Sequence, residues 1–118
     1  YQLYRVAAQA GHAKSMNLLG RYLEEGEHCP ADKAEACLWY ERSARGGDFR
    51  GQFSHASVLA EDGNIDDALR WFERALNGGN LNFLRVTLGT LLEAREPRIR
   101  ALSAAWQVRI DALQGNNG

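Results

Sequence analysis

The sequence predicts an all-α fold: a right-handed α-α superhelix (solenoid) of stacked antiparallel helix pairs, with about seven helices. The first observation is internal repetition, since the segment WYERSARGGD at residues 39–48 recurs as WFERALNGGN at residues 71–80. The second is a third copy of the same spacing near the start of the chain, formed by Leu3, Tyr4, Ala7, Ala8 and Gly11. Self-similarity at a period of this length is typical of stacked helical arrays.

The repeats divide the single domain, residues 1–114, into units. We place a partial unit at about 1–11, full units at 12–47 and 48–79, and a degenerate cap at 80–114, followed by a disordered tail at 115–118. A terminal unit need not stack on a successor, which explains why the last copy lacks the Ala-Ala-x-x-Gly ending. The positions that we predict to hold the repeats together are Gly20, Ala36, Trp39, Tyr40, Ala44, Gly47, Ala68, Trp71, Phe72, Ala75, Gly79 and Trp106.

The first full unit reads as two helices with clear ends. Helix A covers about residues 13–25 and ends at Gly26, since glycine accepts the left-handed conformation found just past a helix end. Helix B follows a loop with Pro30, and Asp32 can cap it with Glu35 three residues later. Its apolar positions fall on one helical face, and Gly46-Gly47 ends it.

The later elements follow the same plan. We expect helix A near 49–61 with a stop at Gly63, and helix B, capped by Asn64 or Asp66, through Leu76 and ended by Gly78-Gly79. A third helix A covers about 81–94, and Pro97 opens a last helix with an apolar stripe that includes Trp106. Residues 114–118 contain no apolar side chain to bury and are expected to fray.

Gly20 lies in the middle of a predicted helix. Glycine there costs about 1 kcal/mol relative to alanine. We therefore expect a neighbouring helix to pack too closely at Gly20 for a side chain, and Ala56 to serve the same purpose in the next unit.

At these residues the chain resembles the Sel-one-like (Sel1-like) repeat family, a branch of the tetratricopeptide-like helical repeats. The family pattern runs Leu-Gly, Tyr, Gly, Pro, Asp, then Ala-x-x-Trp-Tyr-x-x-Ala-Ala-x-x-Gly, and the likeness covers about residues 1–80. Leu23, His28 and Cys29 depart from it. The resemblance implies an adaptor that holds partner proteins together without catalysis of its own. The first full unit matches at Leu19-Gly20, Gly26, Pro30, Asp32, Ala36, Trp39-Tyr40, Ser43-Ala44 and Gly47.

Composition narrows the classes of function. A net charge of −1, from 14 basic and 15 acidic residues, gives no reason to expect the phosphate contacts that dominate nucleic-acid binding. No apolar run approaches the roughly 20 residues that span a bilayer. Since the chain lacks an initiating Met and begins inside a repeat, we expect an earlier helix A and any targeting segment to be missing, which leaves the compartment open. The uncovered N-terminal end predicts possible self-association.

Two cysteines supply the alternative function, a metal- or redox-responsive module that uses Cys29, Cys37 and His28. A disulfide and free thiols both stay open, and we favour free thiols because free cysteine behaves as a small buried hydrophobe. His12 or His55 could supply a fourth ligand, but the paired spacings that mark zinc sites are missing. A disulfide-rich branch of the resembling family uses the positions of Ala44 and Gln52, so the resemblance implies no bridge here.

We find no catalytic motif and expect no cofactor. No serine or cysteine lies in a pattern that supplies a base and an oxyanion donor, and the paired glycines lack the Lys-Ser/Thr of a phosphate loop. The sequence instead favours a non-catalytic protein–protein interaction module, a scaffold, adaptor or regulator, that binds a protein or peptide on its concave helix-A face. The candidate binding residues are Asn17, Arg21, Gln52, His55, Arg85 and Thr87.

Overall fold

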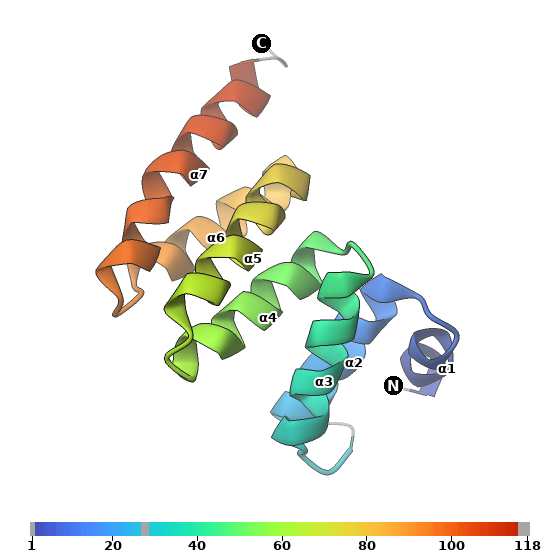
Figure 1. Cartoon of the computed structure of the whole chain (residues 1–118). Coiled ribbons are helices and arrows are strands. Elements are labelled where there is room, and N and C mark those ends of the chain that lie inside the picture. The colour runs from blue at the N-terminus through green and yellow to red at the C-terminus, as the bar shows by residue number, and fades with distance from the viewer. Residues whose placement is uncertain (1, 27–28, 116–118) are drawn as a thin grey trace. The chain divides into compact units, whose positions relative to one another are not determined.

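The computed structural model describes residues 2–26 and 29–115 and, within them, contains seven α-helices and no β-strand, which confirms the all-α helical-repeat fold (Figure 1). The chain forms two compact units, residues 1–75 and 76–118. None of the described helices is long and apolar enough to cross a membrane. The helices are α1 (Gln2–Gln9), α2 (Ala13–Glu25), α3 (Lys33–Arg45), α4 (Phe49–Glu61), α5 (Ile65–Gly78), α6 (Leu81–Leu92) and α7 (Pro97–Gly115).

Most helix ends lie where local sequence places them. Gly26 ends α2 with φ 73° and Gly63 follows α4 with φ 86°, both in the left-handed region that glycine adopts without strain. The side chain of Asp32 accepts a hydrogen bond from the Glu35 backbone N–H at 3.0 Å, which caps α3. Such caps stabilise a helix by about 1 kcal/mol.

Three helix ends differ from the sequence prediction, and one of them is that of α6, which ends at Leu92 instead of about residue 94. Gly79 is the sequence equivalent of Gly47 but has no positive φ, and α5 continues to Gly78 instead of ending at Leu76. Asn80 then caps α6, because its side chain accepts from the Phe83 N–H at 2.9 Å. The helix α7 includes residues 114 and 115, which we had expected to fray, and residues 116–118 lie outside the described part.

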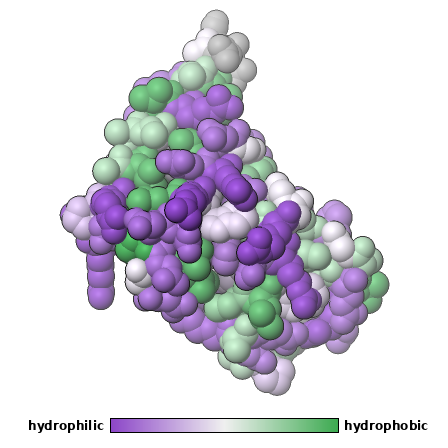
Figure 2. Space-filling view, in the orientation of Figure 1, coloured by the Kyte–Doolittle hydropathy of each residue, from purple (hydrophilic) through white to green (hydrophobic). Residues whose placement is uncertain are grey.

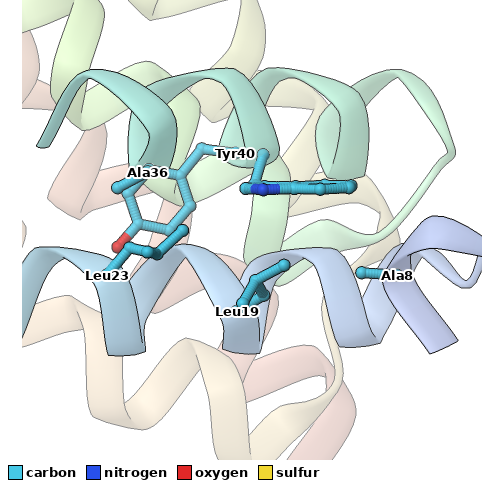
Figure 3. Close-up of a cluster of buried hydrophobic side chains, with 6 residues drawn as sticks. Ala8, Leu19, Leu23, Ala36 and Tyr40 are labelled. Carbon is cyan, nitrogen blue, oxygen red and sulfur yellow. The ribbon is translucent and has the colours of Figure 1, made fainter. Parts of the chain in front are cut away.

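The core of the first unit forms where α3 lies against α2. Figure 3 shows the side chain of Tyr40 reaching from α3 toward α2 beside Leu23. A Cβ added to Gly20 would lie 2.6 Å from the Tyr40 ring, which agrees with the prediction that a neighbouring helix packs closely at this glycine. The buried cluster comprises Ala8, Leu19, Leu23, Ala36, Trp39 and Tyr40.

Ser43 joins three helices at the centre of the first unit. Its hydroxyl is fully buried on α3 and donates a hydrogen bond to the Ala13 carbonyl at the start of α2, at 2.7 Å. Gly51 of α4 faces the same hydroxyl so closely that a Cβ there would overlap it. The first turns of α2 and α4 are therefore both held against the end of α3.

The pairing of α4 with α5 completes the first unit. The Phe53 and Phe72 rings meet edge to face with centroids 5.1 Å apart, and Ala68 and Ala75 are fully buried. Edge-to-face contacts add about 0.5–1.5 kcal/mol to the gain from area burial.

The second unit is built around Trp106. This side chain of α7 is fully buried, and its indole N–H donates to the Thr87 hydroxyl on α6 at 2.9 Å. Thr87 in turn donates to the Phe83 carbonyl at 2.7 Å. The hydrogen bond satisfies the one polar group of the tryptophan, as a buried indole requires. Buried neighbours in the same unit are Leu84, Leu91, Ile99 and Ile110.

Candidate functional site

A groove of about 220 Å³ lies between α2 and α4 on the helix-A side of the first unit. One helical stretch supplies each wall, and the Tyr40 ring of α3 lines it between them. The groove is smaller than the roughly 300–1,000 Å³ of a typical small-molecule site. Its lining residues are Arg21 and Glu24 of α2, Tyr40 of α3, and Phe53, Ser54, Ser57, Val58 and Glu61 of α4.

One hydrogen bond joins the two helices that flank the groove. The Ser54 hydroxyl donates to the Asn17 side-chain oxygen at 2.8 Å and so connects α4 directly to α2. Asn17 is only 3% exposed. Glu24 lies seven residues after Asn17 on α2, or about 10 Å along a helix axis.

Tyr40 supplies both apolar surface and a fixed donor. Its hydroxyl donates to a carboxylate oxygen of Glu24 at 3.1 Å. Burial, followed by the Glu24 charge and hydrogen bond, raises the pKa of Tyr40 well above its ordinary range. The phenol therefore stays neutral at any physiological pH and holds Glu24 in place on the rim.

Charged side chains on the rim have partners that are mostly solvent-exposed. Arg21 lies 3.7 Å from Glu25 on its own helix, and Lys33 lies 3.4 Å from Glu61. All four side chains are at least 45% exposed. Exposed pairs of this kind contribute about 0–1 kcal/mol, so they can be exchanged for a partner's charges at little cost.

The structure separates the predicted binding residues of the first unit. Arg21 is exposed and lines the groove, whereas Asn17 is buried behind it. Gln52 is 9% exposed, and its amide N–H donates to the Ala44 carbonyl at 3.4 Å. His55 is 8% exposed and meets the Trp71 ring edge to face at 5.2 Å. Three of these four polar side chains therefore contact other helices.

The other two predicted binding residues lie in the second unit. Thr87 is buried and bonded to Trp106, as described above. Arg85 is exposed on α6, and its Nε lies 3.2 Å from the Gln114 side-chain oxygen when that amide is oriented to accept. Of these two, only Arg85 offers a solvent-accessible polar group.

Sequence reasoning missed most of the groove. Tyr40 was assigned only to the repeat core, and Glu24, Phe53, Ser57 and Glu61 were not singled out. The signal was present as spacing, because residues 54, 57, 58 and 61 recur three and four apart and so share one face of α4.

His55 lies among charged groups from two neighbouring helices. Burial is the main cause that lowers its pKa, and Arg45 lowers it further, whereas Glu41 and Asp67 act in the opposite direction. The Trp71 ring beside it also carries the guanidinium of Arg74, 4.5 Å from the ring centre. His55 is thus a neutral packing residue at pH 7.

Both cysteines are free thiols in the structure. Cys29 Sγ lies 3.7 Å from the Tyr22 carbonyl, and burial raises the pKa of Cys37. His28, the third member of the alternative metal or redox site, lies outside the described residues. Across residues 2–26 and 29–115, no three His, Cys, Asp or Glu side chains gather in a way that could hold a metal ion.

Hydrophilic side chains cover most of the face seen in Figure 2, with smaller hydrophobic patches between them. On α1, Leu3 is 85% exposed, although its equivalent in the next unit, Trp39, is buried. The exposed large apolar side chains are Leu3, Val6, Leu38, Val86, Leu92 and Val108.

Comparison with known families agrees with the repeat geometry. The Sel1 repeat model matches residues 13–48, which contain α2 and α3, and residues 59–80, which contain α5. No curated protein and no solved structure matches the chain significantly. Sel1 repeats generally mediate protein–protein interactions and are typically non-catalytic. The two matched repeats and the seven α-helices of the described residues identify the chain as a Sel1-like helical-repeat protein.

Proposed function

We propose that this chain is a non-catalytic interaction module that binds a segment of a partner protein in the groove between α2 and α4. The observation that carries the proposal is the lining of that groove, in which Arg21, Phe53 and Ser57 give a cation, an apolar ring and a hydroxyl within one hollow. Helix-A side chains form the inner, concave surface of helix-pair solenoids, where such arrays hold their ligands.

The roles of the predicted binding residues follow from their exposure. Arg21 contacts the partner directly, because it is exposed on the wall. Asn17 positions the wall, because it is buried and bonded to Ser54. Gln52, His55 and Thr87 hold helices together, and exposed Arg85 belongs to the other compact unit.

The test uses the purified chain as bait in its native lysate, followed by mass spectrometry of the retained proteins. Ser57→Trp fills the groove from a half-buried position, and Arg21→Ala removes its exposed cation. Arg74→Ala, an exposed arginine of α5 outside the groove, is the matched control. A protein retained by the unmodified chain and by Arg74→Ala but lost with Ser57→Trp supports the proposal. Equal retention by all baits contradicts it.

A further inference from the structure

The charge of the groove is unevenly distributed along its length. Where α4 is bonded to α2, Asn17 and Ser54 satisfy each other with a neutral hydrogen bond. Seven residues further along each helix, Glu24 of α2 and Glu61 of α4 stand on opposite walls of the same hollow. A ligand that enters this end therefore meets one carboxylate from each wall.

The pKa of the Cys37 thiol reports on the charges near Glu24 and Glu61. Its pKa is raised first by burial, and the charges of Glu24, Asp62 and Glu61 raise it further, whereas Lys33 lowers it. Three carboxylates and one ammonium group thus lie near this one side chain of α3. The carboxylates outnumber the ammonium group, although Lys33 affects the thiol more than any single carboxylate and pairs with Glu61. Arg21 adds one cation to the lining and pairs with Glu25 on its own helix.

The lining that holds the two glutamates also includes apolar surface. The Phe53 ring, the Tyr40 ring and the Val58 side chain line the same hollow. Tyr40 is already bonded to Glu24 and cannot turn away to form another contact without losing that bond. Lysine and arginine side chains have the matching structure, since an aliphatic stem packs on apolar surface while the charged head stays at the wet rim. Aromatic faces also attract such cations.

We infer that the segment bound by this groove presents a lysine or arginine side chain, with its stem against Phe53 and Val58 and its cationic head between Glu24 and Glu61. The inference rests on the proposed function, because it names the chemistry of the segment for the same groove. The volume of about 220 Å³ suits one long side chain.

The test uses five fluorescein-labelled pools of octapeptides, randomised except for one central residue fixed as Lys, Arg, Gln, Leu or Glu. Fluorescence anisotropy measures binding of each pool to the full chain. We expect the Lys and Arg pools to bind about tenfold more tightly than the Gln pool, with the Glu pool weakest. Added salt should reduce the difference, because the rim charges are exposed.

Variants separate this inference from the proposed function. Glu24→Gln/Glu61→Gln keeps the shape and the acceptor for Tyr40 but removes both charges, so the preference for Lys and Arg should disappear. Glu73 is an exposed carboxylate of α5 outside the groove, so Glu73→Gln should keep the preference for Lys and Arg. Circular dichroism confirms that each variant is folded.

The remaining outcomes are distinct. If all pools bind alike and Ser57→Trp abolishes that binding, the groove takes peptides without selecting a cation, and only this inference is overturned. If the preference survives in the double variant, the basic residue binds elsewhere and the inference is again wrong. If no pool binds, or if Ser57→Trp changes nothing, both the inference and the proposed function fail.

Discussion

The Ser54 hydroxyl donates a 2.8 Å hydrogen bond to the side-chain oxygen of Asn17 and thereby joins α4 to α2, the two helices that flank the groove. Asn17 is buried, and its side-chain oxygen already accepts the bond from Ser54. Asn17→Ala should therefore lower the free energy of unfolding by about 1 kcal/mol, the usual net value of a hydrogen bond. Arg21 is exposed, so Arg21→Ala should change the free energy of unfolding by less than about 0.5 kcal/mol.

Urea unfolding followed by circular dichroism measures both changes. If Asn17→Ala leaves stability unchanged, the bond to Ser54 does not hold the wall, and Asn17 returns as a candidate for direct contact. Binding data on the Asn17 variant are interpretable only beside this measurement.

Gly20→Ala should destabilise the first unit. A Cβ there would lie 2.6 Å from the Tyr40 ring and 3.2 Å from the Ala36 carbonyl oxygen. Overpacking costs about 1–3 kcal/mol, which exceeds the gain of about 1 kcal/mol from replacing a helical glycine. Gly89→Ala is the matched control, because nothing lies within 4 Å of its Cβ position in α6. Urea unfolding should show a lower free energy of unfolding for Gly20→Ala and a higher one for Gly89→Ala. If both substitutions stabilise the protein, the helices do not pack closely at Gly20.

His55 should make stability fall as the solution is acidified. Burial lowers the pKa of His55 in the folded state, so the unfolded chain binds the proton more readily. The loss begins near the ordinary histidine pKa of about 6.5 and is complete once the pH is below the lowered folded pKa. Glu41, Arg45 and Asp67 surround the imidazole, and Asp and Glu titrate mainly at lower pH.

The measurement compares urea midpoints at neutral and mildly acidic pH for the unmodified chain and for His55→Phe. The difference between the two proteins should shrink or reverse in acid, because only the unmodified chain has this imidazole to protonate. A constant difference across that range would show that His55 does not titrate differently on folding.

Thiol titration distinguishes the interaction module from the metal or redox alternative. Cys29 and Cys37 are both free in the structure, and burial raises the pKa of Cys37, so its thiolate forms less readily. Two thiols should react with or without reductant and chelator, with Cys37 the slower one once a Cys29→Ser variant identifies it. A thiol that appears only after reductant or chelator is added would favour the alternative.

The exposed face of α1 should cause weak self-association. Leu3 is 85% exposed, whereas Trp39, which occupies the equivalent repeat position, is 7% exposed beneath its neighbours. Light scattering should show a mass that rises with concentration, and Leu3→Gln/Val6→Gln should abolish the rise. A monomer at every concentration would refute this prediction.

The helices could be predicted because their boundaries are set by short-range chemistry. Gly26, Asp32 and Pro97 act on their own turn of the chain, so spacing alone located the ends of α2 and the starts of α3 and α7. Gly78-Gly79 ends α5 as predicted, but Gly79 lacks the positive φ of its repeat equivalent Gly47, and the Asn80 cap starts α6 immediately afterwards.

The candidate site could be predicted only in part. A polar residue on helix A was interpreted as exposed, which is correct for Arg21 but not for Asn17 or Thr87. The partners that bury them, Ser54 and Trp106, are 37 and 19 positions away. No local pattern encodes such pairings. Tyr40 was recognised as core, but a side chain that packs one helix pair and also lines the hollow beside it cannot be identified from periodicity.

The most direct test of the central claim places a photo-crosslinking amino acid at position 57 in the groove and, in a separate protein, at the exposed position 73 of α5, outside the groove. Each protein is irradiated in native lysate, and the crosslinked peptides are sequenced by mass spectrometry. The groove account predicts that position 57 captures one partner segment, with a lysine or arginine beside the crosslink, and that position 73 captures none of it. Capture of the same partner from position 73 alone would contradict the claim that the groove between α2 and α4 is the binding surface.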